Sequence, residues 1–126
     1  MIQIYQIQLT ADQVAQINAE GHDSVPAQTA KLAVNFWGAK KFKPEMLEYY
    51  SEAYRVDTDD LDEAFEWTNI WSNQAAVDCI GDRNYSTSVG DIMRCNERFY
   101  IVDMFGFKEI NLFDDSVAML EGWELT

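Results

Sequence analysis

The sequence has little of the chemistry that metal sites and membrane spans require. It contains one histidine and two cysteines, Cys79 and Cys95, with no C-x-x-C spacing, so it lacks the ligands of a structural zinc site. No apolar run approaches the ~20 residues that cross a bilayer. The N-terminal residues show no secretion signal, and we therefore expect a cytoplasmic protein with free, buried thiols.

Recognisable catalytic motifs are also missing. His22, Asp23 and Ser24 include the residue types of a nucleophilic triad, but adjacent residues cannot adopt that relay geometry. Neither glycine-rich nucleotide-binding pattern occurs, and the segment 57–62 departs from a calcium loop because Leu61 stands at a ligand position. We expect no cofactor, no metal and no enzymatic activity. A small enzyme with a site built from dispersed carboxylates is an open alternative.

Negative charge is abundant and unevenly distributed. The net charge is −13, with a balance of +1 over residues 1–44 and −14 over residues 45–126. Such a field repels nucleic-acid phosphates and anionic membranes and attracts basic proteins. We therefore predict a protein partner with a basic surface and no direct contact with nucleic acid or membrane. The alternative is that the acidity serves only solubility.

The length of 126 residues and the 48% apolar content predict a single acidic domain over residues 1–126. The first half predicts a strand followed by four helices. They are a strand at 2–9, a helix between the Thr10 cap and Gly21 with Val14 and Ile17 inward, a helix between Pro26 and Gly38 with Ala30, Ala33, Val34 and Trp37 at helical spacing, a helix from Pro44 to Ala53 or Tyr54 with a short extended segment near 54–56, and a helix capped by Asp57 or Thr58 that ends near Asn69.

The second half is rich in strand patterns. Residues 71–87 are mixed, and strands are then expected at Ile92–Cys95, Phe99–Met104 and Lys108–Phe113, before a short helix capped by Asp114 or Asp115. The fold class is therefore α+β, with helices packed on a small, mainly antiparallel sheet. We expect a C-terminal β-meander, joined by the first strand.

Four carboxylates recur at helical spacing in the fourth predicted helix. Asp59, Asp62, Glu63 and Glu66 share one stripe at i, i+3, i+4 and i+7. Over the ~1.5 Å rise per residue they give one charge per ~3.5 Å, close to the ~3.4 Å phosphate spacing of a DNA strand. The stripe therefore fits either a DNA-mimicking surface or an ordinary solvent-exposed helix face.

A run of large apolar residues follows the acidic stripe. Trp67, Ile70 and Trp71 exceed what one core-facing stripe of a helix needs. They fit either the hydrophobic core or a partner-binding surface.

Three segments carry a family resemblance: 4–13, 59–65 with Thr68 and Asn69, and 86–92 followed by 100–108. Together they are similar to small uncharacterised proteins of bacteriophages. The S-V-G-D and F-G-F pairing of the last segment resembles the YodL-type domain of conjugative elements, some of them linked to antirestriction. The resemblance implies an accessory protein of a phage or mobile element that works in the bacterial cytoplasm. Together with the uneven charge and the missing catalytic motifs, it leads us to expect a protein that binds a host protein, such as a defence or nucleic-acid enzyme. A structural or virion-associated phage protein is the alternative, and the oligomeric state is left open.

Overall fold

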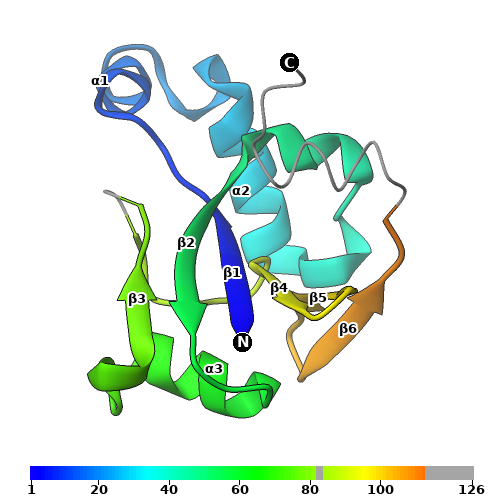
Figure 1. Ribbon diagram of the computed structural model, residues 1–126. Helices are drawn as coiled ribbons and strands as arrows, with labels where there is room; N and C mark the ends of the chain where they lie inside the picture. The colour runs from blue at the N-terminus through cyan, green and yellow to red at the C-terminus, as the bar shows by residue number, and fades with distance from the viewer. Residues whose placement is uncertain (82–83, 113–126) are drawn as a thin grey trace, which may run out of the picture.

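The computed structural model describes residues 1–81 and 84–112. Its strands are β1 Ile2–Ile7, β2 Tyr50–Val56, β3 Val77–Cys79, β4 Ile92–Cys95, β5 Arg98–Val102 and β6 Phe107–Ile110. They form one six-stranded sheet in the order β3-β2-β1-β4-β5-β6, with every neighbouring pair antiparallel (Figure 1). The predicted α+β class is confirmed, as are the β4-β5-β6 meander and the entry of the first strand into the same sheet.

Three α-helices and four short 3-10 helices accompany the sheet in the described part of the chain. They are α1 Ala11–Glu20, α2 Pro26–Trp37 and α3 Leu61–Asn69, with η1 His22–Ser24, η2 Gly38–Lys40, η3 Pro44–Tyr49 and η4 Gln74–Ala76. Among these helices, none is long and apolar enough to cross a membrane.

The ends of α1 and α2 follow the local signals in the sequence. The Thr10 side chain accepts a hydrogen bond from the Gln13 backbone, and the Gln13 side chain accepts one from the Thr10 backbone, which completes a capping box. Gly21 and Gly38 follow the two helices with φ of 98° and 58°, a region that favours glycine. These predicted boundaries are confirmed.

Two side chains on the predicted apolar faces of helices, one of them predicted to point inward, are exposed instead. Val14 of α1 is 36% exposed and Trp37 at the end of α2 is 51% exposed. The helix α1 buries none of its residues completely, and Figure 1 places it at the periphery, beyond the end of β1. Helical periodicity predicts which residues share a face, but it does not show how much of that face the rest of the protein covers.

The predicted helix from Pro44 to Ala53 or Tyr54 is wrong beyond its first turns. Residues Pro44–Tyr49 form η3, and the chain then becomes β2, which pairs with β1 on one side and β3 on the other. A β-bulge at Ala53 explains the error, because Ile4 faces Tyr54 while Tyr5 faces Glu52. The extra residue interrupts the period-two alternation by which a strand is recognised.

The remaining predictions concern short elements in the second half. The mixed segment forms η4 and β3, and a turn at Asn96 joins β4 to β5. The end of the predicted last strand at Phe113, and the helix capped by Asp114 or Asp115, lie outside the described residues.

The sheet separates two hydrophobic clusters. One contains Tyr5 and Ile7 of β1 with Val34 of α2, and the other contains Ile2 and Ile4 of β1 with Ala64 of α3. Because alternate residues of a strand point to opposite faces, α2 and α3 cover opposite faces of the sheet. Figure 1 shows α2 behind the strands and α3 at the N-terminal end of β1.

Candidate protein-binding surface

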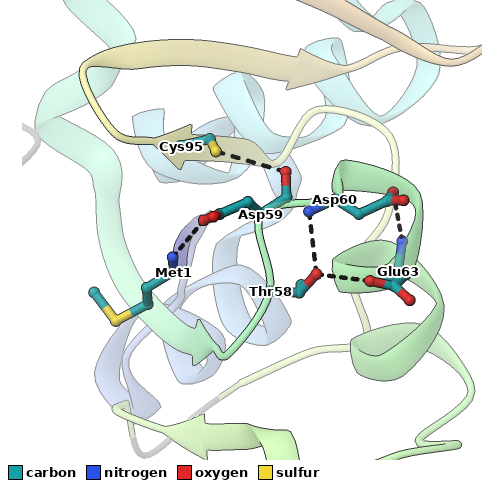
Figure 2. A network of polar contacts seen from close by, with 6 residues as sticks. All are labelled: Met1, Thr58, Asp59, Asp60, Glu63 and Cys95. Atoms are coloured by element: carbon teal, nitrogen blue, oxygen red, sulfur yellow. Dashed lines mark hydrogen bonds and ion pairs between the residues drawn. The ribbon is translucent and has the colours of Figure 1, made fainter.

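The start of α3 is fixed by two short polar side chains. The Asp60 carboxylate accepts hydrogen bonds from the backbone N–H groups of Asp62 and Glu63 at 2.9 and 3.2 Å. The Thr58 hydroxyl accepts from the Asp60 N–H at 3.1 Å and donates to Glu63 at 2.7 Å (Figure 2). Asp60 is therefore the N-cap, and the prediction that Asp57 or Thr58 caps this helix is wrong.

Asp59 lies outside α3 and turns away from it. Its carboxylate contacts the N-terminal amine of Met1 at 2.6 Å, and its carbonyl accepts a hydrogen bond from Cys95 Sγ at 3.7 Å (Figure 2). The hydrogen bond to Asp59 raises the pKa of the Met1 amine. The predicted four-carboxylate stripe is wrong for this member, because a residue before the N-cap leaves the helical path.

The other three members of the stripe are exposed on α3. Residues 56–82 contain eight acidic residues and no lysine or arginine. Two ion pairs join described residues to one another, Met1 with Asp59 and Arg55 with Glu52, and neither involves Asp62, Glu63 or Glu66. We define these three as the α3 acidic surface. No neighbouring cation within the described residues neutralises it.

The three large apolar residues after the stripe divide between core and surface. Trp67 packs against the cluster around Ile2 and Ile4, and the ring of Trp71 meets that of Tyr54 edge to face with centroids 5.5 Å apart. Ile70 is 64% exposed. Of these three apolar residues, Ile70 alone is exposed, whereas Trp67 and Trp71 are partly buried.

Two exposed apolar side chains lie in the β5–β6 turn, which the sequence analysis did not single out as a site. The Asp103 N–H donates to the Gly106 carbonyl at 2.9 Å and closes the turn, with Gly106 at φ 74°. Met104 is 58% exposed and Phe105 94% exposed. Hairpin turns favour polar residues and glycine, so two large apolar residues at the tip indicate an interaction surface. The F-G-F segment at 105–107 was the sequence feature that could have pointed to this turn.

A pocket of about 280 Å³ lies between this turn and α3. Phe65 of α3 and Phe107 of β6 contribute aromatic rings that meet edge to face with centroids 6.3 Å apart. Asp62 belongs to the same lining. The α3 acidic surface and the exposed turn are therefore parts of one continuous region.

A buried carboxylate stands apart from this region. Asp91 is 4% exposed, and its Oδ2 accepts hydrogen bonds from Gln6 Nε2 and the Ser88 N–H, both at 3.0 Å. Burial raises the pKa of Asp91 to about 7, although these two hydrogen bonds and the charge of Lys31 oppose the change. Burial lowers the pKa of Lys31, whose ammonium donates to the Ile7 carbonyl at 3.2 Å.

The S-V-G-D segment has a structural role in the described molecule. The Tyr50 hydroxyl donates to the Gly90 carbonyl at 2.6 Å, and a side chain at Gly90 would lie 2.7 Å from Val34 Cγ2. The Asp91 backbone N–H and carbonyl bond to Ser88 and Val102. Because Asp91 is inaccessible to a substrate, its raised pKa reflects burial in a folding network and does not identify a catalytic acid.

The residues considered as metal ligands do not come together. Within residues 1–81 and 84–112, no three His, Cys, Asp or Glu side chains are grouped so that they could hold a metal ion. Cys79 and Cys95 are both free, and Cys79 is exposed on the short strand β3. The prediction that the thiols are buried is therefore wrong for Cys79, and Cys95 is only partly buried.

Comparisons with protein-family models, with curated proteins and with solved structures find no match to this chain.

Proposed function

We propose that this chain is a non-catalytic protein-binding domain that engages a partner with a basic surface. The observation that carries the proposal is the α3 acidic surface. Its carboxylates are exposed, they lack a cationic neighbour in the described structure, and they lie next to exposed apolar side chains. Acidic residues that only keep a protein soluble need no such apolar neighbours.

The charge of the surface favours a basic protein over other classes of partner. Unpaired carboxylates accelerate association with a positively charged surface and repel nucleic acid and anionic lipid. A protein that binds DNA offers such a basic surface. With Asp59 outside the helix, however, the remaining three charges do not reproduce an extended phosphate row. The proposal therefore rests on charge complementarity and does not require detailed DNA mimicry.

The resemblance to bacteriophage and conjugative-element proteins supplies the biological setting. It suggests an accessory protein that acts in a bacterial cell on a host defence or nucleic-acid enzyme. If that setting is correct, the partner should be released from DNA when this chain binds its basic surface. A virion-associated structural role would instead predict recovery of the chain in particles.

The test is affinity capture from bacterial lysate, followed by binding measurements with the purified partner. The charge variant combines Asp62→Asn, Glu63→Gln and Glu66→Gln, which keeps side-chain size and hydrogen-bond acceptors. The control combines Glu20→Gln, Asp23→Asn and Glu45→Gln, three exposed acids far from α3 in the sequence.

We expect the charge variant to bind its partner at least tenfold more weakly at low salt, while the control stays close to the native protein. The difference should shrink near 1 M salt, where the Debye length falls to ~3 Å. Equal losses in both triple variants would show that net charge alone, and not the α3 acidic surface, determines binding. Unchanged binding in the folded charge variant would refute the proposal.

A further inference from the structure

The pocket beside the α3 acidic surface has an apolar lining over most of its extent. Beyond the two phenylalanine rings, Val89, Val102 and Met104 contribute to it. Val102 is only 3% exposed, whereas Met104 is 58% exposed, so the lining extends from the core to solvent. A volume of about 280 Å³ is just below the ~300 Å³ at which small-molecule sites begin, and it suits a single large side chain.

Two carboxylates give this pocket its charge. Asp62 lies in the first turn of α3, and Asp103 begins the β5–β6 turn. Asp103 Oδ1 accepts hydrogen bonds from the Ala39 N–H at 3.3 Å and the Met104 N–H at 2.9 Å, which hold the carboxylate in place. Neither carboxylate forms an ion pair within the described residues. An occupant therefore meets apolar walls and fixed negative charge together.

The exposed turn residue Phe105 adds an anchor next to the pocket. The ring is 94% exposed, so it makes almost no stabilising contact within its own chain. Binding sites commonly combine such an aromatic anchor with a pocket that receives the partner's side chain. Gly106 at φ 74° keeps the turn tight between the anchor and Phe107 of the lining.

We propose that this pocket receives a large apolar side chain of a partner protein, from a segment in which lysine or arginine flanks that side chain. The inference rests on the proposed function and specifies how the partner is recognised. Charge complementarity selects this occupant over a second copy of the chain. Two copies meeting here would bring Asp62, Asp103 and Glu66 of each toward like charges of the other.

The probes are two labelled hexapeptides of lysine and arginine, one with leucine at its third position and one with alanine there. Fluorescence anisotropy at low salt gives their affinities for the native protein. We expect the leucine peptide to bind about tenfold more tightly, because its extra carbon atoms enter an apolar lining. Amide signals of Phe65, Val89 and residues 104–107 should shift in NMR spectra with the leucine peptide and less with the alanine peptide.

Two matched variants test the location of the site. Met104→Ser removes an exposed part of the lining and should abolish the preference for leucine over alanine. Ile80→Ser changes an apolar residue that is 43% exposed just after β3, at the opposite edge of the sheet from β6, and should retain the preference.

The outcomes separate this inference from the proposed function. Equal, salt-dependent binding of both peptides would overturn the pocket proposal and leave the α3 acidic surface as the binding element. A native dimer in sedimentation velocity that Met104→Ser dissociates would assign the pocket to a second copy and also overturn it. Failure of both peptides to bind at low salt would count against both proposals.

Discussion

The two faces of the sheet are covered by helices of different character. α2 places Ala27, Ala30 and Val34 fully against the first hydrophobic cluster, whereas α3 buries only Ala64 and Thr68. On the α2 face, Gly90 lies so close to the backbone of Val34 that a Cβ added at Gly90 would be 2.9 Å from the Val34 carbonyl carbon. The α3 face leaves an apolar pocket at one end and directs its carboxylates outward.

We interpret the difference as one between a face that mainly stabilises the fold and a face that leaves surface for binding. Close packing on the α2 side favours stability, because buried apolar area and dense contacts provide most of the free energy of folding. The α3 side leaves an apolar pocket beside exposed carboxylates, which is typical of a binding surface, although Phe36 and Trp37 of α2 are exposed as well. The following predictions test this contrast, starting with the largest expected effect.

Gly90→Ala should be the most destabilising change and should act on the α2 face. The new Cβ would lie 2.7 Å from Val34 Cγ2 and 2.9 Å from the Val34 carbonyl carbon, at a φ of 97°. Backbone strain and overpacking together should lower the free energy of unfolding by about 4 kcal/mol. Urea denaturation measures this loss.

Gly21→Ala is the matched control for that prediction. Gly21 has nearly the same φ, 98°, but nothing lies within 4 Å of the position of a Cβ. It should lose only the free energy of holding alanine in an extended positive-φ conformation that glycine adopts readily, about 1–3 kcal/mol. Similar losses in both variants would show that the close approach of α2 to Gly90 is not restrictive.

Asp91→Asn should change how stability depends on pH. The folded pKa of about 7 lies above the ordinary value of 3.8, so the folded state holds an extra proton between these values. The native protein therefore loses stability from this group as pH rises from ~4 through ~7, while the variant does not. Relative to the native protein, the variant should gain a few kcal/mol from pH 4 to pH 8 in chemical denaturation.

The groups around Asp91 define what would contradict that expectation. Lys31 favours the ionised carboxylate, whereas Tyr50 and Tyr54 have raised pKa values and stay neutral over this range. If the two stability curves run parallel from pH 4 to pH 8, Asp91 is already ionised in the folded protein at low pH. The buried network would then contribute no pH dependence.

Removing one tyrosine hydroxyl from each face should give the smallest effects. The Tyr50 hydroxyl donates to the Gly90 carbonyl in a buried hydrogen bond, while the Tyr54 hydroxyl donates to the Tyr85 carbonyl in a partly buried one. Tyr50→Phe should cost about 1.5 kcal/mol and Tyr54→Phe about 0.5 kcal/mol, because water can replace the partner of a partly exposed carbonyl. Thermal unfolding measures the stability that each variant loses. A larger loss for Tyr54→Phe would show that the α3 face, and not the α2 face, is the more closely packed.

Predictions from sequence succeeded where neighbouring residues decide the structure. The Thr10–Gln13 capping box and the glycines that end α1 and α2 involve hydrogen bonds within a few residues, and all three are confirmed. The failures at β2 and at Asp59 have separate causes. Pairing with a distant strand introduced a bulge at Ala53, whereas the N-cap lies at Asp60, two or three residues later than predicted, and leaves Asp59 outside the acidic stripe.

The candidate site could be predicted only in part from the sequence, because some of its residues lie far apart along the chain. Its charge is readable from residues 56–82, because a run of acids without a lysine or arginine remains acidic in any fold. The pocket combines side chains of α3, of the segment before β4 and of the β5–β6 turn, and no sequence spacing relates these elements. Periodicity likewise cannot show whether an apolar residue such as Phe105 meets the core or solvent.

The sequence by itself determined the α+β class, the ends of the first two helices and the negative charge of the second half. Each depends on composition or on interactions between residues close in the chain. Only the tertiary structure decided the burial of Asp91 against Gln6, 85 positions away, and the pocket beside α3. The physical reason is that distant contacts form only when the whole sheet is assembled, which brings side chains together irrespective of their separation along the chain.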